Sequence, residues 1–314
     1  SEEARRAVQI SLVAQVASTH LALLADDELL RVARDTVATR EQSLDLVRLR
    51  VKHGASSDAD LRQAESLLET ARVALVQAQR QRALDDNALV QLLGRPLPAD
   101  LPPAPTLAQA IASGGLQELP VGLPADVLLR RPDVRQAEQQ LVAANANIGA
   151  ARAAFFPRIT LTGSAGQASG ALSALFQAGH AAWSFVPQLV MPLFDAGRNQ
   201  ANLQAATVAR DVAVAQYERA VQAAFRDVAD ALAGRATLAE QRAAQARLVQ
   251  AEGERTRLAE LRWRGGVASH LEWLDAQRSL LAARQALVQV DLLLALNRVA
   301  MYRVLGGGAP QPAG

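Results

Sequence analysis

The sequence predicts a mainly α-helical protein with a small β part, built around an internal two-fold repeat. Three observations support this fold class. Residues 49–94 reappear without a gap 212 positions later, as residues 261–306. Long stretches rich in alanine, leucine and arginine contain no proline and almost no glycine, which favours long helices. One stretch near the middle alternates apolar and polar residues with a period of two, as a β-strand does.

The repeat is the strongest evidence for the architecture. Identical residues occupy equivalent positions in both copies, including the glycines that are expected to end helices. The matched pairs include Leu49/Leu261, Arg50/Arg262, Gly54/Gly266, Ser57/Ser269, Ala64/Ala276, Leu68/Leu280, Ala71/Ala283, Arg72/Arg284 and Gly94/Gly306. A repeat of this length indicates one large helical unit used twice, which is typical of an internally symmetric assembly.

Composition and charge exclude several classes of function. The formal net charge is only +2 and the arginines are interspersed with acidic residues, so nucleic-acid binding is not expected. The chain has no cysteine, and its four histidines lack metal-ligand spacing, so we expect no disulfide, metal site or cofactor. No catalytic constellation is present, so we do not expect an enzyme. No uninterrupted run of about 18 apolar residues occurs, which argues against a transmembrane helix.

The first repeat, residues 1–94, is predicted to be a helical hairpin. Residues 2–52 form one long helix without glycine or proline. Gly54 suits a left-handed cap at the end of that helix. Ser57, followed three residues later by Asp60, resembles a capping box for a second helix that ends at Gly94.

Two connecting segments follow. Residues 95–132 are rich in proline, glycine, leucine and alanine, and we interpret them as a linker that packs along the outside of the helices. Residues 133–156 are predicted to form a short helix, because Pro132 is acceptable in a first turn and the pattern remains helical up to Phe156.

Residues 157–198 are predicted to form a long-looped β-hairpin. The first strand covers residues 159–165 and the second covers residues 183–194, where Met191 and Leu193 continue the apolar face. Apolar residues fall on one face of the hairpin, and serine, threonine and glutamine on the other. This pattern suits the wall of a membrane pore, although a soluble hairpin packed on the helices has a similar pattern. The predicted membrane-facing residues are Ile159, Leu161, Trp183, Phe185 and Leu189.

The second repeat, residues 199–306, is predicted to be another helical hairpin. Its first helix covers residues 199–264 and is interrupted only by Gly234 and Gly253. Gly265 and Gly266 end that helix. The run from Ser269 to Glu272 matches a capping box for a last helix that continues to residue 305.

Several runs of residues resemble the outer membrane factor (TolC-like) family, and most closely its lipoprotein channels of tripartite RND-type efflux pumps. The resemblance covers essentially the whole chain. The runs that carry it are LPADVLLRRPDVRQAE at 123–138, ANANIGAARAAFFPRITLT at 144–162, WSFVPQ at 183–188, FDAGRN at 194–199 and LDAQR at 274–278.

The resemblance implies a homotrimer whose strands form a β-barrel in the outer membrane of a Gram-negative cell. The helices would then form a long antiparallel α-helical barrel in the periplasm, in contact with a periplasmic adaptor (membrane fusion) protein and an inner-membrane pump. The implied function is passive efflux of small molecules, including antibiotics. A duct for protein secretion shares the fold, and a coiled-coil scaffold without a pore is a further alternative. The run at 145–157 favours efflux over secretion.

The resemblance also implies functional residues at the two hairpin turns. It places a periplasmic gate at Leu271, Asp275 and Arg278, whose spacing puts them on one face of a helix. Asp275 and Arg278 could pair within or across chains, or could be an ordinary surface pair. Trp263 and Arg264 stand where the family has a tyrosine and an arginine in contact with this gate. The turns themselves, which include Gly54, Ser57, Gly266 and Ser269, are expected to contact the adaptor.

The position of the hairpin within the repeat gives one more expectation. The strand pair at 157–198 belongs to the second repeat, so a first-repeat pair is expected 212 positions earlier, before residue 1. We therefore expect an N-terminal truncation that removes a signal sequence, the acylated (palmitoylated) cysteine of the lipoprotein branch, one helix and two strands.

Overall fold

The computed structural model describes residues 2–96, 104–112, 129, 131–170 and 181–307. The chain divides into two compact units, which are described separately. One comprises Ser1–Pro132 together with Ala223–Gly314, and the other comprises Asp133–Gln222. The mainly α-helical fold class with a small β part is confirmed. Parts of the predicted linker, at 97–103, 113–128 and 130, and the loop of the predicted β-hairpin at 171–180 lie outside the described residues.

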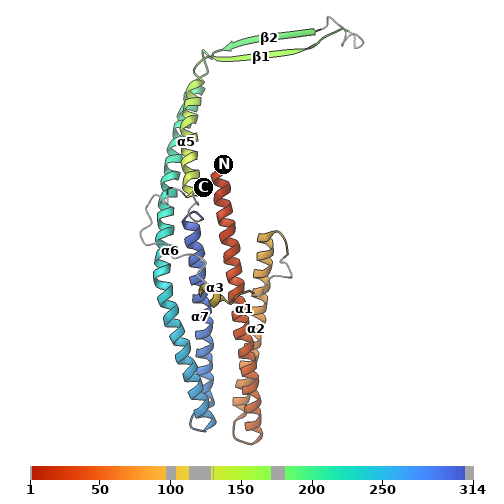
Figure 1. Cartoon of the computed structure of the whole chain (residues 1–314), viewed down its shortest axis with the longest axis vertical. Helices are drawn as coiled ribbons and strands as arrows, with labels where there is room; N and C mark the ends of the chain where they lie inside the picture. The colour runs from red at the N-terminus through yellow and green to blue at the C-terminus, as the bar shows by residue number, and fades with distance from the viewer. Residues whose placement is uncertain (1, 97–103, 113–128, 130, 171–180, 308–314) are drawn as a thin grey trace. The chain divides into compact units, whose positions relative to one another are not determined.

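The first unit contains two antiparallel helical hairpins (Figure 1). Helix α1 (Glu2–Lys52) pairs with α2 (Asp58–Leu93). The later part of α6 (Arg198–Arg264) is joined by a short turn to α7 (His270–Val304). These bounds lie within one or two residues of the predicted ones, because the glycines that end each helix are local signals that packing does not override.

The two turns have the same backbone structure, as the sequence repeat predicts. Gly54 and Gly266 both adopt the left-handed conformation, with φ of +69° and +73°. In each turn two N–H groups donate to carbonyls of the preceding helix and so satisfy acceptors that the helix end leaves free. The bonds are Gly54 N to Val51 O (3.0 Å), Ala55 N to Arg50 O (2.8 Å), Gly266 N to Trp263 O (3.0 Å) and Val267 N to Arg262 O (2.9 Å).

The main core of this unit lies near the turns and joins all four helices. Tryptophan and leucine side chains fill it, and alanines let the helices approach closely. Its buried members are Leu44, Val47, Ala64, Leu68, Ala259, Trp263, Trp273 and Ala276. Because residues from both repeats share this cluster, the two hairpins are held to one another as well as folded individually.

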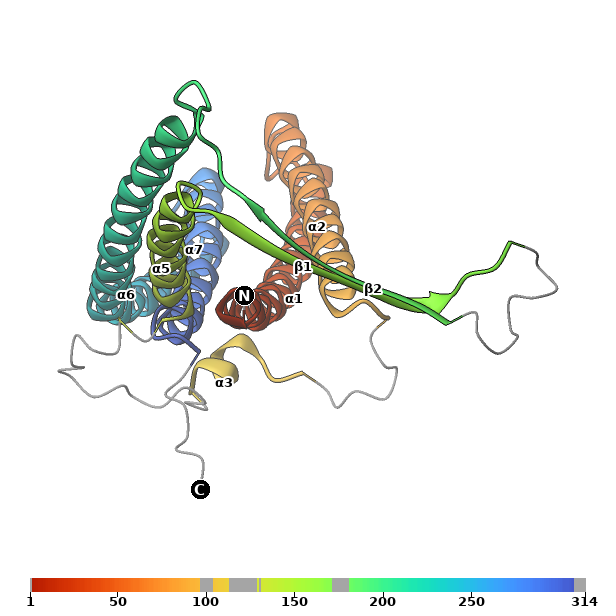
Figure 2. The same cartoon turned by 90° about the horizontal axis from the view of Figure 1, so that it is seen from above.

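The predicted linker contains an unpredicted short helix, α3 (Leu107–Ala112). It packs against α1 and α7, as Figure 2 shows. Leu107 and Ile111 are buried in a second cluster with Leu24 and Val288, and Arg298 donates to the carbonyl of Ile111. A six-residue helix is too short to have a strong periodic signal of its own, so its tertiary contacts are what stabilise it.

Helix α6 is continuous, so the predicted interruptions at Gly234 and Gly253 are wrong. Gly234 instead permits a close helix contact. A Cβ at this position would lie 2.4 Å from Nδ2 of Asn297, which donates to the carbonyl of Ala231 (3.0 Å). The cost of a helical glycine is therefore offset here by a hydrogen bond between α6 and α7.

Two helices are apolar enough on average to cross a membrane, contrary to the expectation from uninterrupted runs. α1 and α7 each contain an 18-residue window with a mean hydropathy of 1.5, of which 17% and 33% is buried. The apolar residues of these helices are dispersed among polar ones, as in helices that contact several neighbours. The same helices bury Asp26 and Asp291, which favours packing against other helices over contact with lipid.

The second unit contains α5 (Pro132–Ala153), the first part of α6, and a two-stranded antiparallel sheet. Helix α5 ends at Ala153, three residues before the predicted end, and Phe155 and Phe156 lie in the following turn. Asn199 at the start of α6 is buried and donates to the carbonyl of Ala154 (3.1 Å).

Strands β1 (Arg158–Gln167) and β2 (Ala181–Val190) run side by side, as Figure 2 shows. The register pairs Ile159 with Leu189, Leu161 with Pro187, Gly163 with Phe185 and Ala165 with Trp183. Residues opposite one another share a face, so the five predicted membrane-facing residues all lie on one side. The second strand ends at Val190, so Met191 and Leu193 are wrongly predicted to extend it. Pro192, which cannot donate a ladder hydrogen bond, explains the earlier end.

The left-handed turn gives a stability prediction. We expect Gly266→Ala to lower the free energy of unfolding by about 1–2 kcal/mol, because an alanine Cβ is strained at positive φ. The matched control is Gly253→Ala in the same hairpin, where the new Cβ has room, with Leu280 Cδ1 4.0 Å away. That variant should be more stable by about 0.5–1 kcal/mol. Urea unfolding measures both, and equal effects of the two substitutions would contradict the assignment of the turn.

Candidate functional site

The candidate site lies at the turn of the α6–α7 hairpin. Ser269 caps α7, and its Oγ accepts a hydrogen bond from the N–H of Glu272 (3.3 Å). The carboxylate of Glu272 does not return to the backbone of Ser269, as a full capping box requires, but accepts from Arg262 of α6 (2.5 Å). The predicted box is therefore only half formed here, because Arg262 offers a charged donor across the hairpin.

The turn of the α1–α2 hairpin has the complete capping box. Ser57 Oγ accepts from the N–H of Asp60 (3.2 Å), and the N–H of Ser57 donates to the Asp60 carboxylate (3.1 Å). The carboxylate of Asp60 accepts hydrogen bonds from the N–H of Ser57 and from the hydroxyls of Ser57 (2.8 Å) and Ser56 (2.9 Å), which lower the pKa of Asp60 because they favour its charged form. The two turns thus share a backbone structure but present different side-chain networks.

An aromatic cluster lies just behind the two turns. Trp263 of α6 stacks on Trp273 of α7 with ring centroids 4.7 Å apart, and His270 lies 4.9 Å from Trp263. The guanidinium of Arg50, from α1, lies 4.4 Å from the Trp263 ring centroid, within reach of a cation–π interaction. The cluster therefore ties one repeat to the other.

Trp263 and Arg264 each have a local partner, and no hydrogen bond or ion pair joins either of them to Leu271, Asp275 or Arg278 in the part of the chain that the structure describes. Trp263 is buried in the aromatic cluster, where its indole ring stacks on Trp273. Arg264 forms an ion pair with Glu260, one helical turn away (2.5 Å). Their contact with the gate, which the resemblance implies, stays a prediction.

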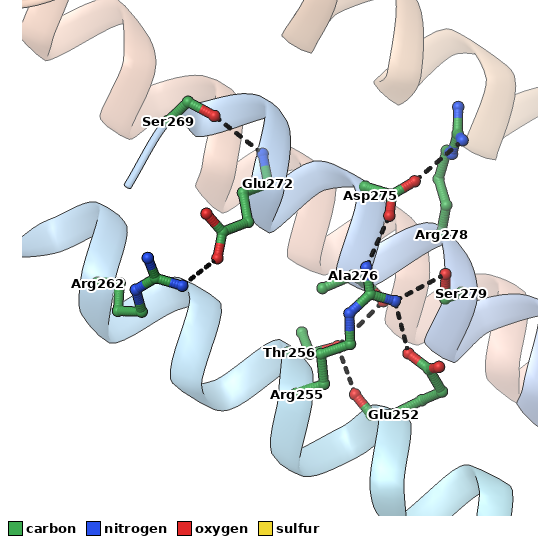
Figure 3. A network of polar contacts seen from close by, with 10 residues as sticks. All are labelled: Glu252, Arg255, Thr256, Arg262, Ser269, Glu272, Asp275, Ala276, Arg278 and Ser279. Carbon is green, nitrogen blue, oxygen red and sulfur yellow. Dashed lines mark hydrogen bonds and ion pairs between the residues drawn. The ribbon is translucent and has the colours of Figure 1, made fainter. Parts of the chain in front are cut away.

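Asp275 forms two ion pairs at the predicted gate. It accepts from Arg278 on its own helix (3.2 Å) and from Arg255 of α6 (2.7 Å), as Figure 3 shows. Arg255 also contacts Glu252 (3.1 Å) and Ser279 (3.2 Å). Asp275 and Arg278 therefore pair within one chain, and the role of this pair in a gate stays a prediction.

Arg255 is a site residue that the sequence analysis missed. The signal was available in the hairpin geometry: positions 255 and 275 are equally far from Gly265, so an antiparallel hairpin brings them together. Thr256 and Ala276 are equally far from Gly266, and the carbonyl of Ala276 accepts from the threonine Oγ1 (3.1 Å).

The three predicted gate residues line one groove of about 410 Å³ at this end of α7. Gln63 and Leu67 of α2 form part of the same groove. Leu271 is 69% exposed and Arg278 also faces solvent. The structure therefore brings together an apolar, an acidic and a basic side chain on one exposed helix face.

The strand residues predicted to face the membrane are all exposed. Their accessible fractions range from 58% for Phe185 to 80% for Trp183. The polar face carries a hydrogen bond between Ser164 Oγ and Ser184 Oγ (2.8 Å). Within the second unit the strands bury little of their surface against the helices, because almost every described strand residue is exposed. Such a continuous apolar surface requires a covering environment.

No group of three or more histidine or acidic side chains that could hold a metal occurs among the described residues. The site is instead a set of charged pairs, apolar side chains and turn backbone.

Comparisons with known proteins identify relatives of this chain. The family model described as "Outer membrane efflux protein" matches residues 1–95 and 123–307. The toluene efflux pump outer membrane protein TtgF of Pseudomonas putida is 48% identical over 306 residues, which cover 98% of this chain and 63% of that protein. The cation efflux system protein CusC of Escherichia coli is 42% identical over 313 residues, covering 99% of this chain and 67% of CusC.

Among solved structures, the open state of the MtrE outer membrane channel of Neisseria gonorrhoeae is similar, with a TM-score of 0.82 and 40% identity. The similarity covers 98% of this chain and 68% of that one. The chain thus spans about 63% of the length of the first curated relatives that it matches.

The aromatic cluster gives a pH prediction. Burial disfavours the imidazolium form and so lowers the pKa of His270, with nearby Arg50 and Arg40 acting in the same direction and Asp60 opposing them. Since the unfolded chain then binds more protons, the stabilisation is complete above about pH 6.5 and is lost as the pH falls towards the lower folded-state pKa. We expect the wild type to lose more unfolding free energy between pH 7.5 and 5 than His270→Phe does.

Urea unfolding at the two pH values measures this difference. His20→Phe, which removes a histidine from α1 and leaves the aromatic cluster intact, is the control. An identical pH dependence for wild type and His270→Phe would show that His270 titrates normally in the folded protein.

Proposed function

We propose that this chain, which belongs to the outer membrane efflux protein family, forms part of a passive exit duct in the outer membrane of a Gram-negative cell. The duct would conduct small molecules outwards and would have no chemistry of its own. The observation that carries the proposal is the β1–β2 ribbon, whose apolar side chains lie exposed on one face and whose hydroxyl and amide groups lie mostly on the other.

The two faces of the ribbon suit a pore wall in lipid. Ile159, Leu161, Trp183, Phe185 and Leu189 would face the membrane, and the face with Thr160 and Thr162 would face water in the lumen. A two-stranded ribbon leaves its outer edges unpaired, which is costly in a bilayer. The strands are therefore proposed to pair with others in a closed barrel.

We propose a homotrimer as the assembled form. Helices in a ring contact neighbours on two sides, so they require apolar side chains on more than one face. Helix α2 exposes large apolar side chains away from its contacts with α1: Val73, Val76 and Leu84 are 54–60% exposed. Neighbouring subunits would cover these positions.

We propose that Leu271, Asp275 and Arg278 form the inner gate, with Arg255 as a fourth member. Three-fold symmetry would arrange these side chains as rings around the axis. The Arg255–Asp275 pair would hold α7 against α6 and so keep the narrow state in place. Ion pairs between exposed side chains are weak, which suits a gate that has to open.

The two turns are proposed as the surface that meets a periplasmic adaptor, which would in turn contact an inner-membrane pump. Gly54, Ser57, Gly266 and Ser269 present nearly the same backbone twice. An adaptor with repeated helical hairpins could contact both turns in the same manner.

The proposed cargo is a small molecule rather than a protein. The names of the relatives describe toluene, solvent, antibiotic and cation efflux. The protein-secretion duct, which shares the fold, and the scaffold without a pore are the alternatives.

Single-channel recording tests the duct and the gate together. The polypeptide that the gene encodes, purified from outer membranes and inserted into planar bilayers, should give a current, whereas a scaffold should give none. The double variant Asp275→Ala/Arg278→Ala should raise the current, because the rings that narrow the pore are removed. Arg255→Ala should act in the same direction, because Asp275 then loses its contact with α6.

Arg257→Ala is the matched control. Arg257 lies two residues from Arg255 on the same helix, but its ion pair with Glu254 (2.6 Å) stays on α6. We expect it to leave the current unchanged. An open duct whose current does not respond to any of the three gate substitutions would remove the gate and leave the duct.

A further inference from the structure

A second pocket lies between α1, α6 and α7 and is distinct from the groove of the proposed gate. Its volume is about 290 Å³, and its lining combines apolar side chains with an excess of arginine. The charged residues that line it are Asp35, Arg40, Glu260, Arg264 and Arg284. Trp273 forms part of its wall.

Arg40 is the unusual member of this set, because it is buried without an acidic partner. Arg40 is only 5% exposed. Its Nη1 donates to Oε1 of Gln277, which is neutral. No carboxylate in the described part of the chain forms an ion pair with it. A buried guanidinium has five N–H donors, and one neutral acceptor compensates little of its lost hydration.

The charged groups around Arg40 leave its buried positive charge uncompensated. Burial lowers the pKa of Arg40, and Arg278 acts in the same direction through its own positive charge. The two carboxylates of the pocket are already paired on their own helices, Asp35 with Arg31 (3.3 Å) and Glu260 with Arg264 (2.5 Å). Neither is free to neutralise Arg40.

Arg284 supplies a second cationic group at the exposed side of the same pocket. It forms no ion pair with another residue in the described ranges. The pocket thus combines a buried arginine, a second arginine near solvent and a space large enough for a small molecule. Paired or chelating guanidinium groups match the oxygens of carboxylate and phosphate.

We propose that this pocket binds a small oxyanion, a phosphate or a carboxylate, between Arg40 and Arg284. The bound anion neutralises the buried charge of Arg40 and accepts the donors that Gln277 leaves unused. Because the anion would contact α1 and α7, it links the two repeats close to their turns. The proposal does not depend on the duct, since it uses only the pocket of one chain.

Calorimetric titration with inorganic phosphate, and separately with succinate, tests the proposal on the full chain in detergent at constant ionic strength set with sodium chloride. Fluorescence provides a second readout, because Trp273 lines the pocket. We expect saturable binding of at least one of the two probes. Binding of phosphate alone assigns a phosphate ligand, and competition by succinate assigns a general oxyanion site.

Three variants locate the binding. Arg40→Met should weaken it at least tenfold, and Arg284→Met should weaken it severalfold. Arg34→Met removes the same charge from an exposed position of α1 outside the pocket, and it should leave the affinity unchanged. If Arg40→Met does not fold, as judged by circular dichroism, the exposed Arg284→Met decides the question. The proposal is overturned if neither probe binds the wild type saturably, or if Arg284→Met and Arg34→Met bind equally well.

Discussion

The left-handed turns at Gly54 and Gly266 are the constraint on which the site depends. Each turn reverses a long helix within a few residues, so side chains equally far from the turn meet on neighbouring helices. That geometry places Arg255 against Asp275 and Arg262 against Glu272. Because the same turn occurs in both repeats, the two hairpins end in turns of similar structure.

The aromatic cluster then fixes one hairpin against the other. Trp263 and Trp273 fill the space behind the turns, and Arg50 reaches them from the other repeat. The candidate gate residues lie on the exposed side of this rigid base. This arrangement suits the proposed gate, because weak, exposed ion pairs on a packed support can change partners without unfolding the helices.

The sequence predicted those features that local signals determine. Glycine caps, serine caps and the period-two alternation of β1 gave element types and most boundaries, since these depend on neighbouring residues. Features that depend on distant contacts were not predictable in the same way. Helix α3 forms because Leu107 and Ile111 find an apolar surface on α1 and α7, and Gly234 is tolerated because Asn297 needs the space. The pairing of Arg255 with Asp275 depends on the antiparallel packing of α6 and α7, so no signal in the residues next to Arg255 indicates it.

The central claim is that the exposed face of α7 near its turn lines a water-filled path. Residues 1–314 contain no cysteine, so Leu271→Cys introduces the only thiol among them. A charged, water-soluble thiol reagent added during single-channel recording should change the current stepwise as it modifies this position. Complete modification, verified by mass spectrometry, with no change in current would show that Leu271 lies outside the conducting path and would contradict the account.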